Sequence, residues 1–301
     1  LIPEDVSIQV LTQSRPHIIK KTFDAIKGAK NVVVHLYNST SFAQRQQVFR
    51  MSEDEIVDIA VSGAKLFDEY AAKMPETNFR FEYSPESFTG TEMEFALRIC
   101  NAVIDVWKPR PERQVIINLP STVEMSMPHV YAQQIEYMSK HLHDRENVIV
   151  SIHPHNDRGT AVPPGNWPCW PGASGSRYLF GNGERTGNVD IITMAMNLFT
   201  HGVDPQLDFS DMPKIVECYE RLTGMSVGTA SPTPATWCSP PSPAPTRTPS
   251  PRGCTSGKSG RRNTGPSPTS PWTPTTSTGS TRPTSSASTA SPARGASPTS
   301  W

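Results

Sequence analysis

Residues 32–37 read VVVHLY and residues 148–153 read VIVSIH, and both runs are rich in β-branched residues and apolar on both faces. This pattern is typical of parallel strands that helices cover, whereas strands with one face in water alternate apolar and polar residues. Longer stretches with helical periodicity lie between these and similar runs. The sequence therefore predicts an α/β protein with repeated β-α units around a parallel sheet.

Strands and helices are expected to alternate along the first two thirds of the chain. The expected strands are Ser7–Thr12, Asn31–Tyr37, Phe79–Ser84, Gln114–Leu119, Val148–His153 and a degraded sixth near Tyr178–Phe180. The expected helices lie around Pro16–Lys27, Ser52–Lys73, Thr91–Trp107, Pro128–His143 and Val189–Thr200. Because Ser52 precedes three acidic residues and an apolar periodicity, it is the expected N-cap of its helix. Six strands are two fewer than a (β/α)8 barrel contains, so either the sheet is open or two strands are missing before Leu1.

The charges of the 301-residue chain are divided unevenly. Its 28 Lys and Arg balance its 28 Asp and Glu, and a net charge of zero argues against a protein that binds nucleic acid or a membrane surface. Residues 228–301 contain seven of the basic residues and none of the acidic ones, which leaves 21 basic and 28 acidic residues, a net charge of −7, for residues 1–227. The two parts are therefore expected to differ in structure.

Residues 228–301 are expected to form a disordered tail. This stretch holds 15 of the 30 Pro and no Ile, Leu, Val, Phe, Tyr or Met, so it cannot bury enough apolar surface to offset the entropy of ordering its backbone. The core is therefore expected within residues 1–227. The chain has no 18-residue apolar run, no secretory signal and five Cys without paired spacing, which favours a soluble cytoplasmic protein.

The segment Ser151–Val162, SIHPHNDRGTAV, holds the most informative side chains. His153 and His155 are two residues apart at the end of an expected strand, so both imidazoles are expected on the same side of the sheet. Two such imidazoles, together with carboxylate or water oxygens, form a site for a divalent metal. Spacing alone also allows a pair of surface histidines, but the Asn-Asp-Arg turn that follows lies where parallel α/β proteins build their active sites.

Polar residues also stand near the carboxyl ends of three other expected strands. They are His35, Glu82, Ser84, Glu86, Asn118 and Thr122. Each alone is more typical of a turn or a helix cap, but their convergence on one rim is what an active site on a β/α barrel requires. The glycines of Leu179–Asn188, LFGNGERTGN, suit a loop that cradles a phosphate, a metal shell or a simple turn.

The segments FEYSPESFTGTE, INLPSTVEM, SIHPHNDRGTAV and LFGNGERTGNVD together resemble the 2-isopropylmalate synthase family of actinobacterial type, from Leu1 to about Val227. The resemblance implies a metal-dependent acyltransferase on a TIM barrel, which converts acetyl-CoA, 3-methyl-2-oxobutanoate and water into 2-isopropylmalate and CoA in leucine biosynthesis. It also implies a divalent cation (Mg, Mn or Zn) as cofactor, a cytoplasmic location and a homodimer for the full-length enzyme. The related homocitrate and citramalate synthases are alternatives on the same fold.

The same resemblance assigns roles to individual residues. The implied residues are, for the metal, His153, His155 and Asn188; for the substrate, His35, Ser84 and Thr122; and for catalysis, Glu86 and Glu184. Thr122 would bind the keto-acid carboxylate. The Arg-Asp pair that the family carries on its first barrel strand has no counterpart here, so the chain is expected to be truncated at its start.

Two stretches, residues 163–178 and 228–301, depart from the family pattern and hold five of the six Trp and three of the five Cys. We expect both to be translations of a GC-rich gene in the wrong frame. The codons that PPGNWPCWPG, residues 163–172, permits can be read in the neighbouring frame as AAGELAVLAG, a normal barrel helix. The alternative is a genuine Pro/Ser/Thr-rich linker on a non-catalytic binding protein. With the frame lost, the chain lacks the His and Tyr that the family supplies after the barrel, and it is expected to be inactive and poorly folded.

Overall fold

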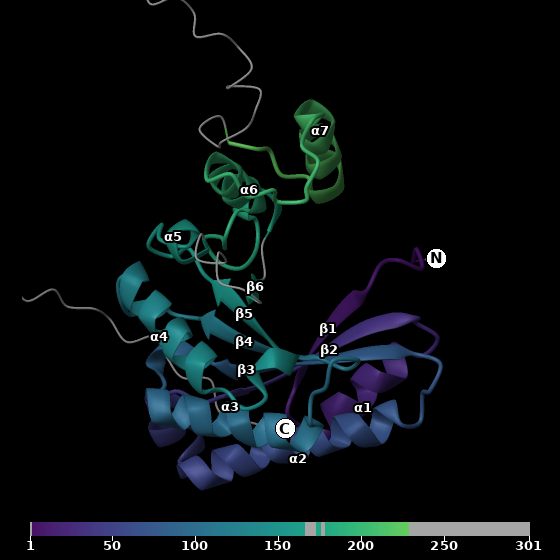
Figure 1. Ribbon diagram of the computed structural model, residues 1–301, viewed down its shortest axis with the longest axis vertical. Helices are drawn as coiled ribbons and strands as arrows, with labels where there is room; N and C mark the ends of the chain where they lie inside the picture. Colours follow the sequence, from purple (N-terminus) through teal and green to yellow (C-terminus); the bar gives the residue numbers. More distant parts are fainter. Residues whose placement is uncertain (1, 166–172, 176–177, 229–301) are drawn as a thin grey trace, which may run out of the picture. The chain divides into compact units, whose positions relative to one another are not determined.

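The computed structural model describes residues 2–165, 173–175 and 178–228, which contain a parallel sheet and its helices (Figure 1). The strands are β1 (Ile8–Gln13), β2 (Asn31–Ser39), β3 (Asn78–Glu86), β4 (Val115–Ser121), β5 (Val148–Pro154) and β6 (Ala173–Gly175). The α-helices are α1 (Pro16–Ala25), α2 (Glu53–Ala71), α3 (Met93–Trp107), α4 (Pro128–His141), α5 (Val162–Gly165), α6 (Ile191–Thr200) and α7 (Met212–Thr223). Shorter helical turns are the π-helix η1 (Gln44–Phe49) and the 3-10 helices η2 (Phe88–Gly90), η3 (Arg145–Asn147) and η5 (Leu179–Gly181).

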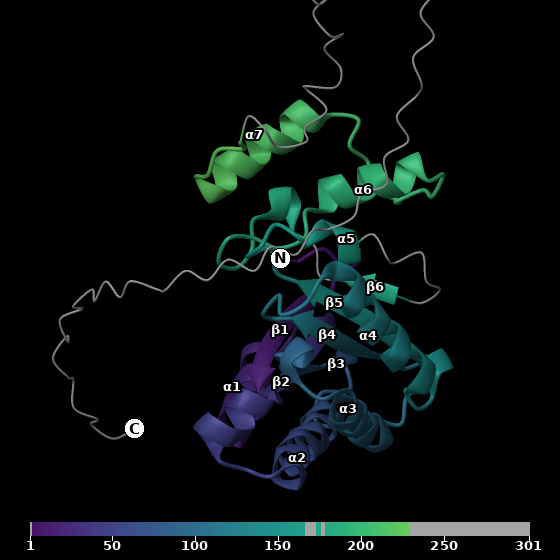
Figure 2. The ribbon, with the colours of Figure 1, turned by 90° about the vertical axis from the view of Figure 1, so that its left-hand side faces the viewer.

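The strands of the sheet lie side by side in chain order from β1 to β6, and each neighbouring pair is parallel. Helices α1 to α4 follow one another along one face of this sheet, as Figure 1 and Figure 2 both show. A doubly wound sheet reverses its strand order and carries helices on both faces, whereas a β/α barrel keeps strands and helices in sequence. The predicted parallel α/β fold is therefore confirmed.

Helix α2 shows how the sequence directs the packing of helices on the sheet. Ser52 caps it as predicted, because its Oγ accepts a hydrogen bond from the backbone N–H of Glu55, whose carboxylate accepts one from the backbone N–H of Ser52. Phe67, on the buried face of α2, packs against Phe81 of β3 and Trp107 of α3. The apolar core therefore lies between the helices and the sheet.

Strand β2 illustrates the two chemically different faces of the sheet. Val32, Val34 and Leu36 belong to the core and are at most 1% exposed. His35 lies between them in sequence, and because successive side chains of a strand point to opposite faces, it lies on the face away from the helices. The same alternation on the neighbouring strands gathers polar side chains on that second face.

The prediction of a sixth strand near Tyr178–Phe180 is wrong. Tyr178 forms an isolated bridge with Asp190, and the 3-10 turn η5 follows it, with Phe180 at φ 56°. The backbone groups pair within the loop, since Tyr178 N–H donates to Val189 O and Gly181 N–H donates to Tyr178 O, so they cannot pair with a sheet. The strand that extends the sheet is β6, and it lies inside the stretch 163–178 that the sequence separates from the family pattern.

Some predictions concern residues outside the described ranges. Residues 166–172, 176–177 and 229–301 lie outside these ranges. The disorder of the tail and the shifted reading frame at 163–178 therefore stay predictions. The sequence patterns did not predict η1 or α7. In the part of the chain that the structure describes, no helix combines the length and the apolar character needed to cross a membrane.

Candidate active site

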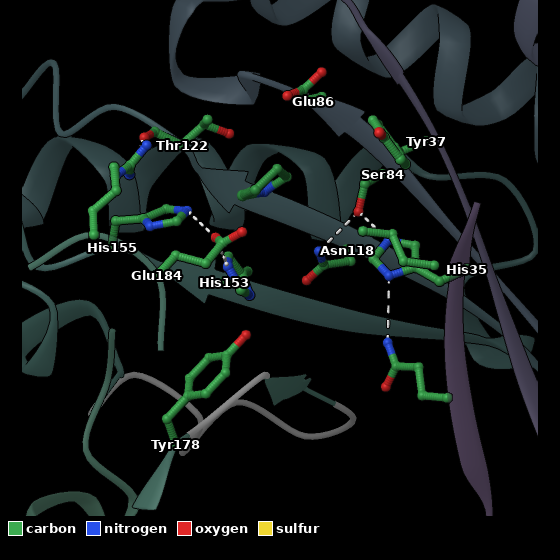
Figure 3. A pocket seen from close by; sticks show the side chains of 14 residues that line it. His35, Tyr37, Ser84, Glu86, Asn118, Thr122, His153, His155, Tyr178 and Glu184 are labelled. Atoms are coloured by element: carbon green, nitrogen blue, oxygen red, sulfur yellow. Dashed lines mark hydrogen bonds and ion pairs between the residues drawn. The ribbon is translucent and has the colours of Figure 1, made fainter. Parts of the chain in front are cut away.

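A cavity of about 430 Å³ opens on the face of the sheet that carries His35, toward the carboxyl ends of the strands (Figure 3). Alternate residues of five consecutive strands form its walls, because every second side chain points to this face. The lining residues on strands are Gln9, Leu11, His35, Tyr37, Ser84, Glu86, Asn118, Pro120 and His153. The lining residues beyond the strand ends are Thr122, His155, Tyr178, Glu184 and Arg185.

Seven of the eight residues predicted for the site thus line one cavity, and the eighth, Asn188, is buried beside His155. The sequence patterns missed Tyr178 and, on or next to the expected strands at the front of the chain, four further lining residues, namely Gln9, Leu11, Tyr37 and Pro120. A signal for these four was present, because each lies on an expected strand or next to its end and is two residues from another residue of the same wall. Period two along each strand would have included them.

One end of the cavity holds three side chains that could ligate a metal, His153, His155 and Glu184. Their ligand atoms all lie within 4.8 Å of one another. Glu184 Oε2 is 3.4 Å from His153 Nε2 and 3.2 Å from His155 Nε2, and Figure 3 shows its carboxylate between the two rings. Two imidazoles and a carboxylate form a donor set that suits Zn, Mn or Mg.

The two imidazoles are neutral near pH 7. Burial lowers the pKa of His153, and burial, followed by repulsion from the protonated form of His153 and from Arg185, lowers the pKa of His155 to about 4. A neutral imidazole keeps a lone pair that a cation can use, whereas an imidazolium has none. The electrostatics of this end of the cavity therefore fit the predicted metal.

Asn188 contacts all three members of this cluster. Its Oδ1 accepts a hydrogen bond of 2.7 Å from the backbone N–H of Glu184, while its Nδ2 lies 3.4 Å from His153 Nε2 and 3.3 Å from His155 Nδ1. The amide oxygen is thus used by the loop that carries Glu184. Ligation of a metal by Asn188 stays a prediction.

The glycines of the loop 179–188 allow it to fold tightly over Asn188. A Cβ atom at Gly183 would lie 2.1 Å from Asn188 Oδ1, so only glycine fits there. The backbone N–H groups of Gly181, Gly187 and Asn188 all donate within the same loop. Since these amides are occupied, the arrangement favours a turn beside a metal site over a loop that cradles a phosphate.

The other end of the cavity is a layer of buried polar side chains. His35 Nε2 is 2.6 Å from Ser84 Oγ, and Asn118 Nδ2 donates to the same Oγ at 2.8 Å. Burial, followed by the positive charge of His153, lowers the pKa of His35 to about 3. Glu82, the strand residue paired with His35, is 3% exposed, and burial raises its pKa to about 7.

Thr122 and Glu86 also line the cavity, and Figure 3 shows Thr122 toward the end that holds His155. Thr122 Oγ1 accepts a hydrogen bond of 3.0 Å from the backbone N–H of Ser87, which leaves its hydroxyl proton free to donate. Ser39 Oγ donates to Glu86 Oε2. Arg185 Nη2 donates to Thr122 O at 2.6 Å, so the loop after β4 is tied to the loop that carries Glu184.

Comparisons with known proteins agree with the resemblance that the motifs carry. The chain is 68% identical over 230 residues to the 2-isopropylmalate synthase of Desulfitobacterium hafniense and 62% identical over 228 residues to that of Helicobacter hepaticus. Each alignment covers 75% of this chain and 41% of the relative, so the chain spans about two fifths of the length of these curated relatives. The resemblance to 2-isopropylmalate synthases is thus confirmed.

Among solved structures, the HMG-CoA lyase of Brucella melitensis is similar with 13% sequence identity and a TM-score of 0.49, over 73% of this chain and 74% of that one. Residues 2–218 match the family model described as HMGL-like. That match covers most of the described residues, including every side chain of the cavity. The chain belongs to the HMGL-like family.

Proposed function

We propose that this chain carries the metal and keto-acid part of a 2-isopropylmalate synthase active site, on six of the eight units of a (β/α)8 barrel. The reaction joins acetyl-CoA, 3-methyl-2-oxobutanoate and water to give 2-isopropylmalate and CoA. The observation that carries the proposal is the single cavity that contains the His153, His155 and Glu184 cluster at one end and the His35, Ser84 and Asn118 layer at the other. The sequential strand order supports the barrel.

The residues that would hold a divalent cation are His153, His155 and Glu184, with Asn188 beside them. Bound there, the cation would supply Lewis-acid polarisation of the ketone of the keto acid. The chain itself contributes two neutral imidazoles and holds Glu184 against them through the hydrogen bond from its backbone N–H to Asn188. The donor set therefore fits the cofactor that the family resemblance implies.

Thr122 is placed to recognise the carboxylate of the keto acid. Its oxygen accepts the Ser87 N–H with one lone pair, and its O–H stays free to donate, which is the group that a carboxylate requires. Glu86 and Glu184 are the carboxylates that line the cavity. We assign acid and base steps to these two residues, including removal of a proton from the acetyl methyl group.

Binding of keto acids tests the proposal on the 301-residue chain. After treatment with a chelator, the chain is titrated with Mg, Mn or Zn and then with 3-methyl-2-oxobutanoate, pyruvate or 2-oxoglutarate in a calorimeter. We expect binding that depends on the metal and prefers 3-methyl-2-oxobutanoate over pyruvate by about tenfold, because its two additional methyl groups are buried. Preference for pyruvate or 2-oxoglutarate would favour a citramalate or homocitrate synthase, and absence of all binding would favour a non-catalytic protein.

A matched pair of variants tests the role of Thr122. Thr122→Val removes the hydroxyl at nearly constant volume and should weaken keto-acid binding by about tenfold, since a hydrogen bond to a charged group contributes about 1.5–3 kcal/mol. Thr122→Ser keeps the hydroxyl and should bind nearly as the wild type. The inactivity of this polypeptide, its cytoplasmic location and a homodimeric full-length enzyme stay predictions. Measurable release of CoA by the chain would overturn the first of these.

A further inference from the structure

Asp157 joins the loop after β5 to the loop that carries Glu184. Its Oδ1 accepts a hydrogen bond of 3.2 Å from Arg185 Nε, and its Oδ2 lies 3.1 Å from Arg185 Nη2. Thr186 Oγ1 also donates to Asp157 Oδ1, at 3.1 Å. A two-point contact between a guanidinium and a carboxylate fixes direction as well as distance. One carboxylate thus holds two consecutive residues of the loop 179–188.

The guanidinium of Arg185 reaches the loop after β4 as well. Its Nη2 donates to Thr122 O at 2.6 Å, so a single side chain connects the loops after β4 and β5 to the loop 179–188. The backbone of Arg185 has φ 55°, in the left-handed region that residues other than glycine seldom adopt. Such a conformation persists where the surrounding contacts hold it. The contacts therefore fix both the side chain and the backbone at this position.

Glu184, the preceding residue, depends on the position of its backbone. Its side chain is 63% exposed, yet its Oε2 lies 3.4 Å from His153 Nε2 and 3.2 Å from His155 Nε2. An exposed glutamate loses rotamer freedom when it is held in one place. The carboxylate stays between the two rings at the lowest cost when the loop keeps the Glu184 backbone close to them.

The segment that follows Glu184 is attached to the loop after β5 in two different ways. At its far end, Gly187 O accepts a hydrogen bond of 2.9 Å from the backbone N–H of Asn156. At its near end, the attachment is the ion pair of Arg185 with Asp157. This pair is therefore the attachment next to the carboxylate that faces the histidines, and a change of one side chain can remove it.

We propose that Asp157 and Arg185 are positioning residues whose ion pair holds Glu184 against His153 and His155 and thereby raises the affinity of this cluster for a divalent cation. Asp157 does not itself belong to the cluster, whose ligand atoms are those of the two histidines and Glu184. The inference deepens the proposed function and rests on the metal site proposed there. Neither member of the pair needs to contact the cation for this role.

The charge and the geometry of Arg185 predict opposite effects on metal binding. A positive charge weakens the binding of a cation in the same cavity, and the charge of Arg185, after burial and His153, contributes to the lowered pKa of His155. If charge alone mattered, Arg185→Gln would bind a cation more tightly. If the ion pair positions Glu184, the same variant binds it more weakly.

Calorimetric titration of the chelator-treated 301-residue chain with Mn or Zn distinguishes the two effects. We expect Asp157→Asn and Arg185→Gln each to weaken binding by about 10–100-fold, the range for residues that orient metal ligands. The matched control is Asp105→Asn, which breaks an exposed ion pair with His143 and should bind as the wild type. Unchanged or tighter binding by Arg185→Gln would overturn the proposal.

A double-mutant cycle separates action through Glu184 from a general structural effect. Asp157→Asn should cause little further loss of affinity in a Glu184→Gln chain, whereas independent effects would add. The side chains of Arg185 and Asp157 are 43% and 33% exposed, so the thermal midpoint of each single variant should fall by no more than about 4 °C. Additive losses, or losses of affinity that accompany a large fall of the midpoint, would overturn the proposal.

Arg185→Lys decides the question if Arg185→Gln does not fold. It keeps the positive charge but not the two-point contact, so weaker binding supports the proposal and binding as in the wild type overturns it. If the wild type binds no cation, the proposed metal site fails and this inference fails with it. If the wild type binds and the variants bind equally well, this inference alone fails.

Discussion

The imidazole of His155 combines burial with access to the cavity. Its side chain is 4% exposed, yet its Nε2 is 3.2 Å from the carboxylate of Glu184, which is 63% exposed. A buried histidine with a lowered pKa does not titrate near pH 7, so it offers its lone pair throughout the neutral range. Such a residue is better suited to hold a cation than to transfer protons.

Replacement of this imidazole should therefore abolish tight metal binding. We expect His155→Ala to weaken binding of Zn or Mn by at least about 100-fold, since even the loss of residues that only support ligands costs 10–100-fold. His129→Ala, which removes an exposed histidine from α4, is the matched control and should bind as the wild type. Calorimetric titration of the chelator-treated chain measures both. Equal affinities in the two variants would contradict the assignment.

The buried carboxyl group of Glu82 should make folding stability depend on pH. Its pKa in the folded chain, about 7, is above the ordinary value of 4.5, so its contribution to stability is fully present below pH 4.5 and is lost as the pH rises through 7. Glu82→Gln cannot ionise, so its stability relative to the wild type should increase by about 3 kcal/mol between pH 4.5 and 8. Urea unfolding of both proteins at the two pH values measures the difference. A difference that does not change with pH would show that Glu82 titrates normally.

At the residue scale, the sequence predicted which side chains share the cavity but not how they pair. The period of two places His35, Ser84 and His153 on one face from local information alone. The contact between Gln9 and Glu82 instead depends on the registers of β1 and β3 against β2, which tertiary packing sets. The sequence patterns therefore could not show that Glu82 lies behind His35.

Among the elements, helix α2 owes its start to a local signal. Ser52 Oγ accepts the Glu55 N–H, and the Glu55 carboxylate accepts the Ser52 N–H, so two backbone donors at the end of the helix are satisfied by neighbours three residues apart. The sequence predicted this element because all the groups that define its start lie within four residues.

Loss of the cap should measurably destabilise the chain. We expect Ser52→Ala to lower the free energy of unfolding by about 1 kcal/mol. Ser62→Ala is the matched control in the same helix, because Ser62 is an exposed interior position where alanine is the better helix former. Chemical unfolding followed by circular dichroism compares the three proteins. A Ser62→Ala variant that loses as much stability as Ser52→Ala would argue against a specific effect of the cap.

The π-helix η1 shows why some elements were not predicted. Arg45, at 3% exposure, donates to Thr40 O and to both oxygens of Glu92, which lies 47 residues further along the chain. Its guanidinium also lies 4.5 Å from the ring centroid of Phe95. A buried arginine with distant partners decides the local backbone here, and no periodicity near residue 45 contains that information.

At the scale of the whole molecule, the β-α units that the structure describes are regular up to β5, and the described helix and strand after it are short. Helices α1 to α4 have 10, 19, 15 and 14 residues, whereas α5, which follows β5, has four. Strand β6 likewise has three residues, and the other strands have six to nine. This break coincides with the stretch that the sequence attributes to a shifted reading frame. Pro163, Pro164 and Gly165 are also poor helix formers.

Replacing residues 163–172 by the segment read in the neighbouring frame should therefore lengthen helix α5. We expect a chain in which AAGELAVLAG replaces PPGNWPCWPG at residues 163–172 to gain about two to three turns of helix, because the new segment removes four prolines and adds strong helix formers. Far-ultraviolet circular dichroism measures the gain. The midpoint of thermal unfolding should rise by about 2–4 °C for each kcal/mol that the longer helix contributes.

A control segment with the composition of AAGELAVLAG in scrambled order separates pattern from composition, since only the restored order should place its apolar residues on one face toward β5. The same gain in helix and stability from the scrambled segment would contradict the restored pattern. Failure of both segments to raise the helix content would favour the sequence PPGNWPCWPG as the native one. Nucleotide sequencing across codons 163–178 then provides an independent answer, because a shifted frame requires a family-like reading beside the translated one, and a genuine linker does not.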